Sequence, residues 1–210
     1  MYAYRARPQS MDLALPRSRR RRKPRALLRP YRGRWRIATN AAYTTPMTTY
    51  GLLARRGRVL ESYPLDWPAL VVLRRGGAFI AEQPTRRLAR AAWFAVGGGP
   101  VLVRGGRPTD IPQEVARLGL TGLAPDEPLA RTAVGVRPDG TVVLSVWRDA
   151  TLETVAQDLI RVGVVHAIGL DGGEGTLLLS RRRGPGRPVI GRANRRVSSL
   201  LVLRRARRIR

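Results

Sequence analysis

From Trp35 onward the chain consists of short apolar runs that are separated by glycine and proline. Runs of this length are typical of β-strands, because a helix needs a longer periodic stretch to bury one face. The pattern predicts strands at 35–39, 50–54, 70–73, 78–81, 94–96, 101–103, 133–136, 142–147, 167–170, 176–179 and 197–203. Pro138-Asp139-Gly140 is a turn that joins two of these strands into a hairpin over 133–147.

One helix is indicated by apolar residues that recur on a single face, at Leu152, Val155, Leu159 and Val162. Thr151 is expected to be its N-cap, and Gly163 to end it. Weaker patterns predict helices at 86–92 and 112–118. The predicted fold is therefore α+β: a single domain with a mixed or mostly antiparallel sheet and two or three helices.

The formal net charge of +26 belongs to the two ends of the chain. Residues 1–36 hold thirteen Arg or Lys and one acid, and residues 181–210 hold twelve and none; the body between them has a net charge of +2. We therefore predict a disordered basic arm over 1–34, a folded domain over 35–204 and a basic tail over 205–210. The ends either contact an anionic polymer, such as nucleic acid, phospholipid headgroups or a wall polymer, or reflect compositional drift without a partner.

The composition excludes several classes of site. The chain has no cysteine, so disulfides, thiolate catalysis and Cys-ligated zinc are excluded, and its one histidine, His166, cannot form a multi-histidine metal site. We expect no cofactor. Asp171 and Glu174 leave a divalent metal open as an alternative, but two nearby carboxylates are weak evidence for one. No apolar run approaches the roughly 20 residues of a membrane span, and the basic start lacks the apolar core of a signal peptide. The compartment stays open; an envelope or extracellular location is expected if the natural chain begins further upstream.

An acidic, glycine-dense turn over 169–176 follows one of the predicted strands. It contains Asp171, and two other segments are expected to meet it: one that begins at Arg131 and a Gly-Gly-Gly-Pro segment at 97–100. Glycines allow the backbone to approach a ligand closely and to direct N–H groups at anionic oxygens. An arginine, a carboxylate and free backbone amides together suit a phosphate-bearing substrate.

From 37 to 202 the chain resembles the phosphodiester glycosidase family, which has eukaryotic and bacterial members. The resemblance rests on segments in the family's order: Asn40-Ala41-Ala42-Tyr43, Gly51-Leu52-Leu53, Gly57-Arg58-Val59-Leu60, Gly97-Gly98-Gly99-Pro100, Arg131-Thr132-Ala133, Leu170-Asp171-Gly172-Gly173 and Arg195-Arg196-Val197. It implies hydrolysis of a phosphodiester that links the anomeric carbon of a sugar to another group. Its catalytic candidates are Asp171 and Arg131, to which we add Glu174, a second carboxylate that is not part of the family pattern. The candidate substrate-binding residues are Asn40, Gly97, Gly98, Gly99, Gly172, Gly173 and Thr176.

Under this resemblance Arg131 would clamp the phosphate with its guanidinium group, and Asp171 would handle the proton or stabilise charge at the sugar. Asn40 would orient the substrate or Asp171. Each also has an ordinary structural interpretation: a surface arginine, a turn-capping aspartate and a turn asparagine.

The chain departs from the family pattern at Glu174 and at Ala41-Ala42, which replaces a glycine pair. Glu174 would either share acid and base roles with Asp171 or repel a phosphate, which would mark a changed substrate or an inactive site. The alternative function is a non-catalytic family member that binds anionic polymers through its basic ends.

Overall fold

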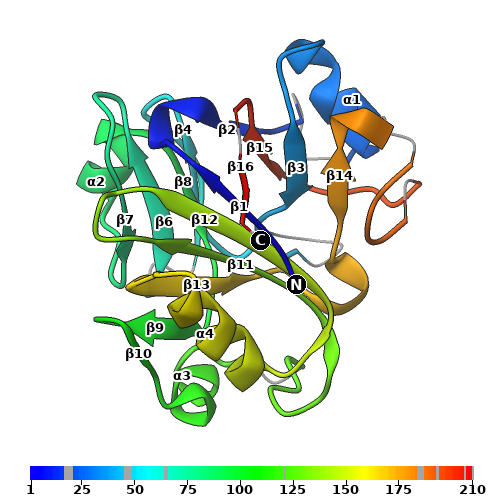
Figure 1. Cartoon of the computed structure of the whole chain (residues 1–210). Coiled ribbons are helices and arrows are strands. Elements are labelled where there is room, and N and C mark those ends of the chain that lie inside the picture. Colours follow the sequence, from blue (N-terminus) through cyan, green and yellow to red (C-terminus); the bar gives the residue numbers. More distant parts are fainter. Residues whose placement is uncertain are drawn as a thin grey trace.

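The computed structural model describes residues 1–16, 21–44, 49–63, 66–120, 122–183, 187–192, 194–205 and 207–209. In this part of the chain the strands form three antiparallel sheets, which pack together with four α-helices into one domain (Figure 1). The predicted α+β class is confirmed, with four helices where two or three were expected. Apolar faces of all three sheets meet in the largest core cluster, which includes Phe94, Leu144 and Leu201, each 0% exposed.

The seven-stranded sheet carries the predicted hairpin at its centre. β11 (Leu129–Val136) pairs with β12 (Val142–Ala150), and Val134 lies opposite Leu144. Their turn is closed by the Gly140 N–H, which donates to the Arg137 carbonyl at 2.9 Å. The strand order is β10-β9-β13-β11-β12-β1-β16, with β10 at Arg107–Pro108, β9 at Val101–Arg104, β13 at His166–Leu170, β1 at Tyr2–Ala6 and β16 at Arg207–Ile209.

The other two sheets lie on either side of the core. The four-stranded sheet has the order β14 (Leu178–Ser180), β3 (Ile37–Asn40), β15 (Leu200–Leu203) and β2 (Met11–Ala14). The five-stranded sheet has the order β5 (Arg58–Tyr63), β4 (Gly51–Arg55), β8 (Ala92–Gly97), β6 (Ala69–Leu73) and β7 (Ala78–Ala81).

The predicted long helix is α4 (Leu152–Arg161), which packs against the seven-stranded sheet. Its apolar stripe is buried, and Thr151 caps it by accepting the Thr154 N–H at 3.1 Å. The other α-helices are α1 (Pro24–Leu28), α2 (Arg86–Ala91) and α3 (Ile111–Arg117), and the 3-10 helices are η1 (Pro8–Ser10), η2 (Arg29–Tyr31), η3 (Gly173–Gly175) and η4 (Arg181–Arg183). None of the helices in the described residues has the length and apolar character needed to cross a membrane.

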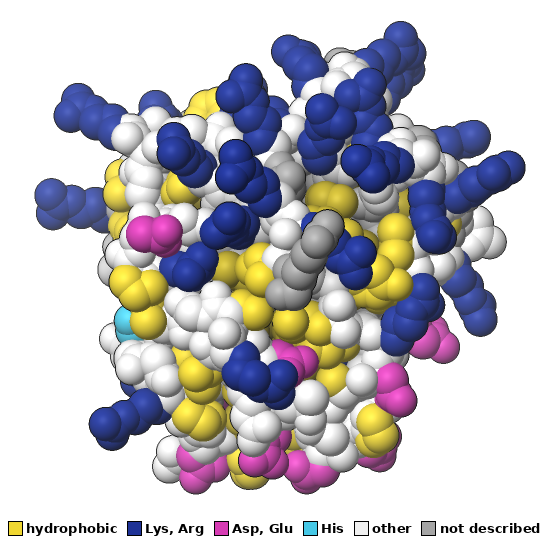
Figure 2. Space-filling view, viewed as in Figure 1, with side chains coloured by type: hydrophobic (Ala, Val, Ile, Leu, Met, Phe, Trp, Pro, Cys, Tyr) yellow, Lys and Arg dark blue, Asp and Glu magenta, His cyan; other side chains and the backbone are white. Residues whose placement is uncertain are grey.

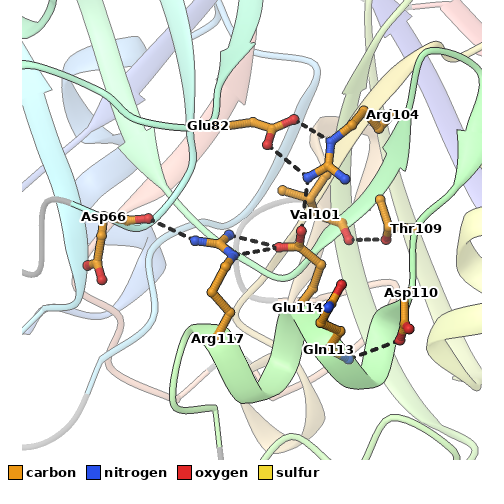
Figure 3. A network of polar contacts seen from close by, with 9 residues as sticks. All are labelled: Asp66, Glu82, Val101, Arg104, Thr109, Asp110, Gln113, Glu114 and Arg117. Atoms are coloured by element: carbon orange, nitrogen blue, oxygen red, sulfur yellow. Dashed lines mark hydrogen bonds and ion pairs between the residues drawn. The ribbon is translucent and has the colours of Figure 1, made fainter.

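An ionic network joins α3 to two of the sheets (Figure 3). Glu114 is buried and accepts hydrogen bonds from Arg104 on β9, at 2.9 Å, and from Arg117, at 2.8 Å. Arg104 also donates to both oxygens of Glu82, the residue after β7, and these hydrogen bonds hold the pKa of Glu82 below its ordinary value. The network therefore connects the edge of the seven-stranded sheet to the five-stranded sheet.

The N-terminal segment contradicts the prediction of a disordered arm. β1 lies inside the seven-stranded sheet, between β12 and β16, and β2 forms the edge of the four-stranded sheet. Met11 and Leu13 are 0% exposed. These short apolar segments have no strong local pattern, because arginines and prolines flank them, and they become strands only when other strands pair with them. Of the expected arm, residues 17–20 lie outside the described residues; the expected basic tail contributes β16.

An ion pair ties this segment to the five-stranded sheet. The buried Asp12 carboxylate accepts hydrogen bonds from Arg55 on β4, at 3.1 and 2.8 Å, and from the Tyr31 hydroxyl at 2.9 Å. Burial, together with the negative charge of Asp12, raises the pKa of Tyr31 above its ordinary value. The first strands are therefore part of the core.

Candidate active site

The acidic turn begins where β13 ends, at Leu170. The Asp171 N–H donates to the Ala41 carbonyl at 3.2 Å, and the Asn40 Nδ2 donates to the Asp171 carbonyl at 2.5 Å. The chain then enters η3, where the Gly175 N–H donates to the Gly172 carbonyl at 2.8 Å. The turn is therefore held against the end of β3 by hydrogen bonds on both sides of Asp171.

Asn40 lines the pocket beside Asp171 and positions this turn through several side-chain hydrogen bonds. It is 2% exposed, and its Oδ1 accepts the Leu177 N–H at 2.8 Å and the Thr132 hydroxyl at 3.2 Å. These bonds join β3 to β11 and to the chain just before β14. Asn40 acts on Asp171 through the backbone carbonyl.

Burial raises the pKa of the Asp171 carboxyl to about 6, because the charged form loses solvation. The positive charges of Arg195 and Arg21 act in the opposite direction with a smaller effect. Gly175 lies directly against this carboxyl group, and a Cβ there would overlap the carboxylate oxygens. Only glycine at position 175 leaves room for the Asp171 carboxyl group in its buried place. This burial is what raises the pKa of Asp171.

A small polar pocket with a volume of about 10 Å³ opens beside Asp171. Three arginines line it, namely Arg21, Arg195 and Arg196, together with Ser198 and Ser199. The Nη2 of Arg21 is buried and, within the described residues, has no hydrogen-bond partner. A buried guanidinium nitrogen without a partner is costly, so this nitrogen is suited to an anionic ligand in the pocket.

Glu174 does not share the pocket with Asp171. Its side chain is 97% exposed, and its Oε2 lies 3.8 Å from the Arg195 Nη1. Arg195 also donates to the Glu174 backbone carbonyl. The sequence left two roles open for Glu174, sharing acid and base roles with Asp171 or repelling a phosphate. The short 3-10 helix directs its side chain into solvent, where it pairs with Arg195.

Arg131 has a different environment from the one expected for a phosphate clamp. It is 3% exposed, and its guanidinium group donates to the carbonyls of Leu123 at 2.8 Å, Ala124 at 2.5 Å, Glu127 at 2.9 Å and Ala150 at 3.1 Å. Four of its five N–H donors are therefore used by the loop before β11 and by the end of β12. The guanidinium group holds the loop and the strand in place, so it lacks the free donors that the expected phosphate clamp needs.

The Gly97–Gly99 segment was expected to present free amides, and two of its N–H groups are bonded. The Gly98 N–H donates to Pro68 at 2.9 Å, and the Gly99 N–H donates to Gly169 at 2.8 Å. A Cβ on Gly98 would overlap the Gly169 carbonyl. Gly98 permits the close approach of the segment after β8 to β13, at whose end Asp171 lies, whereas Gly97 packs against β4.

The remaining predicted residues lie in the turn itself. Gly172 and Gly173 connect Asp171 to η3, and Gly173 has a positive φ of 55° that favours glycine. The Thr176 hydroxyl donates to the Ala130 carbonyl at 3.1 Å. Thr176 therefore fastens the turn to β11.

Sequence reasoning missed several residues that surround Asp171: Arg21, Ser198, Ser199 and Gly175. Ser198 and Ser199 directly follow the Arg195-Arg196-Val197 segment, which was a usable signal. Arg21 had none, because it is one of forty basic residues and lies in a basic run. Among the described residues there is no cluster of three or more His, Cys, Asp or Glu that could hold a metal ion.

Comparisons with known proteins give a family and a fold. The sequence model of the phosphodiester glycosidase family matches residues 34–204. No curated protein sequence matches the chain. The solved catalytic domain of zebrafish N-acetylglucosamine-1-phosphodiester alpha-N-acetylglucosaminidase, auto-inhibited by its pro-peptide, is similar with a TM-score of 0.76 and 19% identity, over 93% of this chain and 73% of that one. A hypothetical protein from Synechocystis has a TM-score of 0.68 and 14% identity, over 99% of this chain and 59% of that one. At these identities the structural likeness establishes the fold.

Proposed function

The chain belongs to the phosphodiester glycosidase family, and from this premise we propose that it hydrolyses a phosphodiester that links the anomeric carbon of a sugar to another group. One observation carries the proposal: the partly buried carboxyl group of Asp171, whose pKa is raised to about 6, lines the same pocket as three arginines. A group that titrates near neutral pH beside positive charges suits proton transfer on an anionic substrate.

Asp171 acts as the base in this proposal. When the bond between the anomeric carbon and oxygen breaks, the leaving group is a phosphate monoester, which departs as an anion and needs little protonation. The demanding task is then the activation of water and the stabilisation of positive charge at the sugar. An ionised Asp171 does both. Its pKa near 6 leaves it mostly ionised at neutral pH yet still able to accept a proton.

The phosphate is held by Arg195, Arg196 and Arg21 in this proposal. Guanidinium groups pair with two phosphate oxygens at once, and the buried Arg21 Nη2 lacks any other partner among the described residues. Arg195 also contacts the Glu174 carbonyl, which orients it along the edge of the turn. These residues take the role that the sequence had suggested for Arg131.

The test is hydrolysis of a panel of sugar-1-phosphodiesters, including a GlcNAc-1-phosphodiester, by the wild type and by Asp171→Asn and Arg195→Gln. Arg161→Gln is the matched control, because Arg161 is a 70% exposed arginine on α4, outside the pocket. We expect Asp171→Asn to abolish turnover, Arg195→Gln to raise KM, and the control to behave as the wild type. All variants should keep the wild-type circular dichroism spectrum.

Absence of turnover by the folded wild type across the panel would refute this function. It would favour the alternative, a non-catalytic family member that binds anionic polymers. Turnover that persists in Asp171→Asn would refute the assignment of the base.

A further inference from the structure

Arginines from both ends of the chain line a groove with a volume of about 1780 Å³. Nine arginines line it, among them Arg5 on β1, Arg36 before β3, Arg182 in η4, and Arg207 and Arg208 on β16. Figure 2 shows the uneven distribution: Lys and Arg side chains gather over the upper half of this face, and acidic side chains gather at its lower rim. The groove and the Asp171 pocket have no lining residue in common. The groove is therefore a separate, positively charged surface.

The registry of two strands brings like charges together in this groove. β1 and β16 pair antiparallel, and Arg5 lies directly opposite Arg207. Both residues are exposed. Like charges directly opposite each other in a sheet are destabilising. Among the described residues that line the groove, Asp139 is the only acid, so the structure retains a positive cluster that the fold itself does not neutralise.

Tyr2 in the groove does not offer a free platform for nucleic-acid bases. The guanidinium groups of Arg148 and Arg208 lie 5.9 and 5.3 Å from the centre of the Tyr2 ring. Single-stranded nucleic acids are usually held by bases that stack on open aromatic rings. A ring that is engaged with arginines cannot serve in this way, and Tyr4, the other tyrosine of the groove, is half-buried. The charged groups of the groove are therefore mainly guanidinium groups.

We propose that this groove binds a linear polymer that carries a phosphate in each unit and no aromatic bases, such as a polyol-phosphate or sugar-phosphate chain. A concave site suits a chain better than a flat membrane surface. Guanidinium groups form paired hydrogen bonds with phosphate oxygens, and such contacts depend only on the phosphates of the polymer, not on the groups between them. The inference does not depend on turnover, because the groove lies apart from the Asp171 pocket.

The experiment measures binding of a fluorescently labelled poly(glycerol phosphate) chain to the full-length protein as a function of salt. The double variant Arg5→Gln/Arg207→Gln removes the opposed pair. Arg86→Gln/Arg87→Gln is the control with the same change of charge, since these exposed arginines lie on α2 and do not line the groove. Each lost phosphate contact lowers the slope of log K against log salt by about 0.7, so the groove variant should lose about 1.4 and the control nothing.

Thermal unfolding provides the second readout. Removal of the opposed charges should leave the Tm of the groove variant unchanged or raise it, so that lost binding cannot be ascribed to lost folding. Equal loss of slope in both double variants would overturn the proposal in favour of a general effect of net charge. So would tighter binding of an oligothymidylate with the same number of phosphates, or binding only to anionic lipid vesicles.

Discussion

Replacement of Arg131 by methionine distinguishes a structural arginine from a phosphate clamp. The substitution keeps the length and apolar stem of the side chain but removes four hydrogen bonds to backbone carbonyls. One of these carbonyls belongs to Ala124, which has a positive φ of 45° and is therefore in a conformation that non-glycine residues rarely adopt. The arginine holds this strained loop against β11.

The magnitude follows from the environment of the guanidinium group. A hydrogen bond to a charged group contributes about 1.5–3 kcal/mol, and four of them would give roughly 6–12 kcal/mol. Burial of the charge offsets several kcal/mol of this, and it lowers the pKa of Arg131 below its ordinary value. The free energy of unfolding should therefore fall by about 3–5 kcal/mol, which for a chain of this size is a decrease in Tm of roughly 6–20 °C.

Differential scanning calorimetry and urea denaturation of Arg131→Met measure this loss, with Arg161→Met as the control. Arg161 makes a single ion pair with Asp158 and is 70% exposed, so its removal should change stability by less than about 1 kcal/mol. A variant Arg131→Met with the wild-type Tm but without turnover would refute this reasoning and restore the phosphate clamp.

Four further predictions concern the catalytic turn and the N-terminal strands. The kcat/KM of the wild type should rise with pH through an apparent pKa of about 6 as Asp171 ionises, and a flat profile between pH 5 and 7 would contradict its role as a base. Because its pKa is raised, the contribution of Asp171 to stability is greatest below the unfolded value of 3.8 and is lost as pH rises through about 6. Asp171→Asn should therefore be more stable than the wild type at pH 8 by about 2 kcal/mol in urea titrations. Gly175→Ala should displace the Asp171 carboxylate and lower kcat at least tenfold with only a small change in Tm, a pattern that stopped-assay kinetics and calorimetry together would test. Asp12→Ala should destabilise the protein by about 3 kcal/mol because it leaves Arg55 unpaired, whereas the exposed Asp149→Ala should have little effect; equal Tm values would show that the first strands contribute little.

The sequence predicted most of the elements from Trp35 onward, because their signals are local. The periodic apolar stripe of α4, its Thr151 cap and the Pro138-Asp139-Gly140 turn each depend on neighbours within a few residues, and the structure contains all three. β1, β2 and β16 were missed because their residues are stabilised by strands that are distant in sequence. β1, for example, pairs with β12, more than a hundred residues away.

The residues of the candidate site also fall into those that the sequence could identify and those that required the tertiary structure. The position of Asp171 at a glycine-rich turn, and the family itself, could be recognised from the sequence. The roles of its neighbours depended on the tertiary structure. Arg131 and Glu174 have the residue types that phosphate chemistry needs, yet one is used by four carbonyls and the other points into solvent.

The identity of a charged residue therefore determined what it can do, and its surroundings decided whether it is free to do so. A guanidinium group binds a phosphate only when no carbonyl already occupies its donors, and a carboxyl group titrates near neutral pH only when the fold buries it. Asp171 acquires its raised pKa and Arg21 its unpartnered nitrogen from chain segments that meet only in the folded protein. The sequence by itself determined the family, the strand-rich architecture and the acidic turn, and the tertiary structure decided which arginines face that turn.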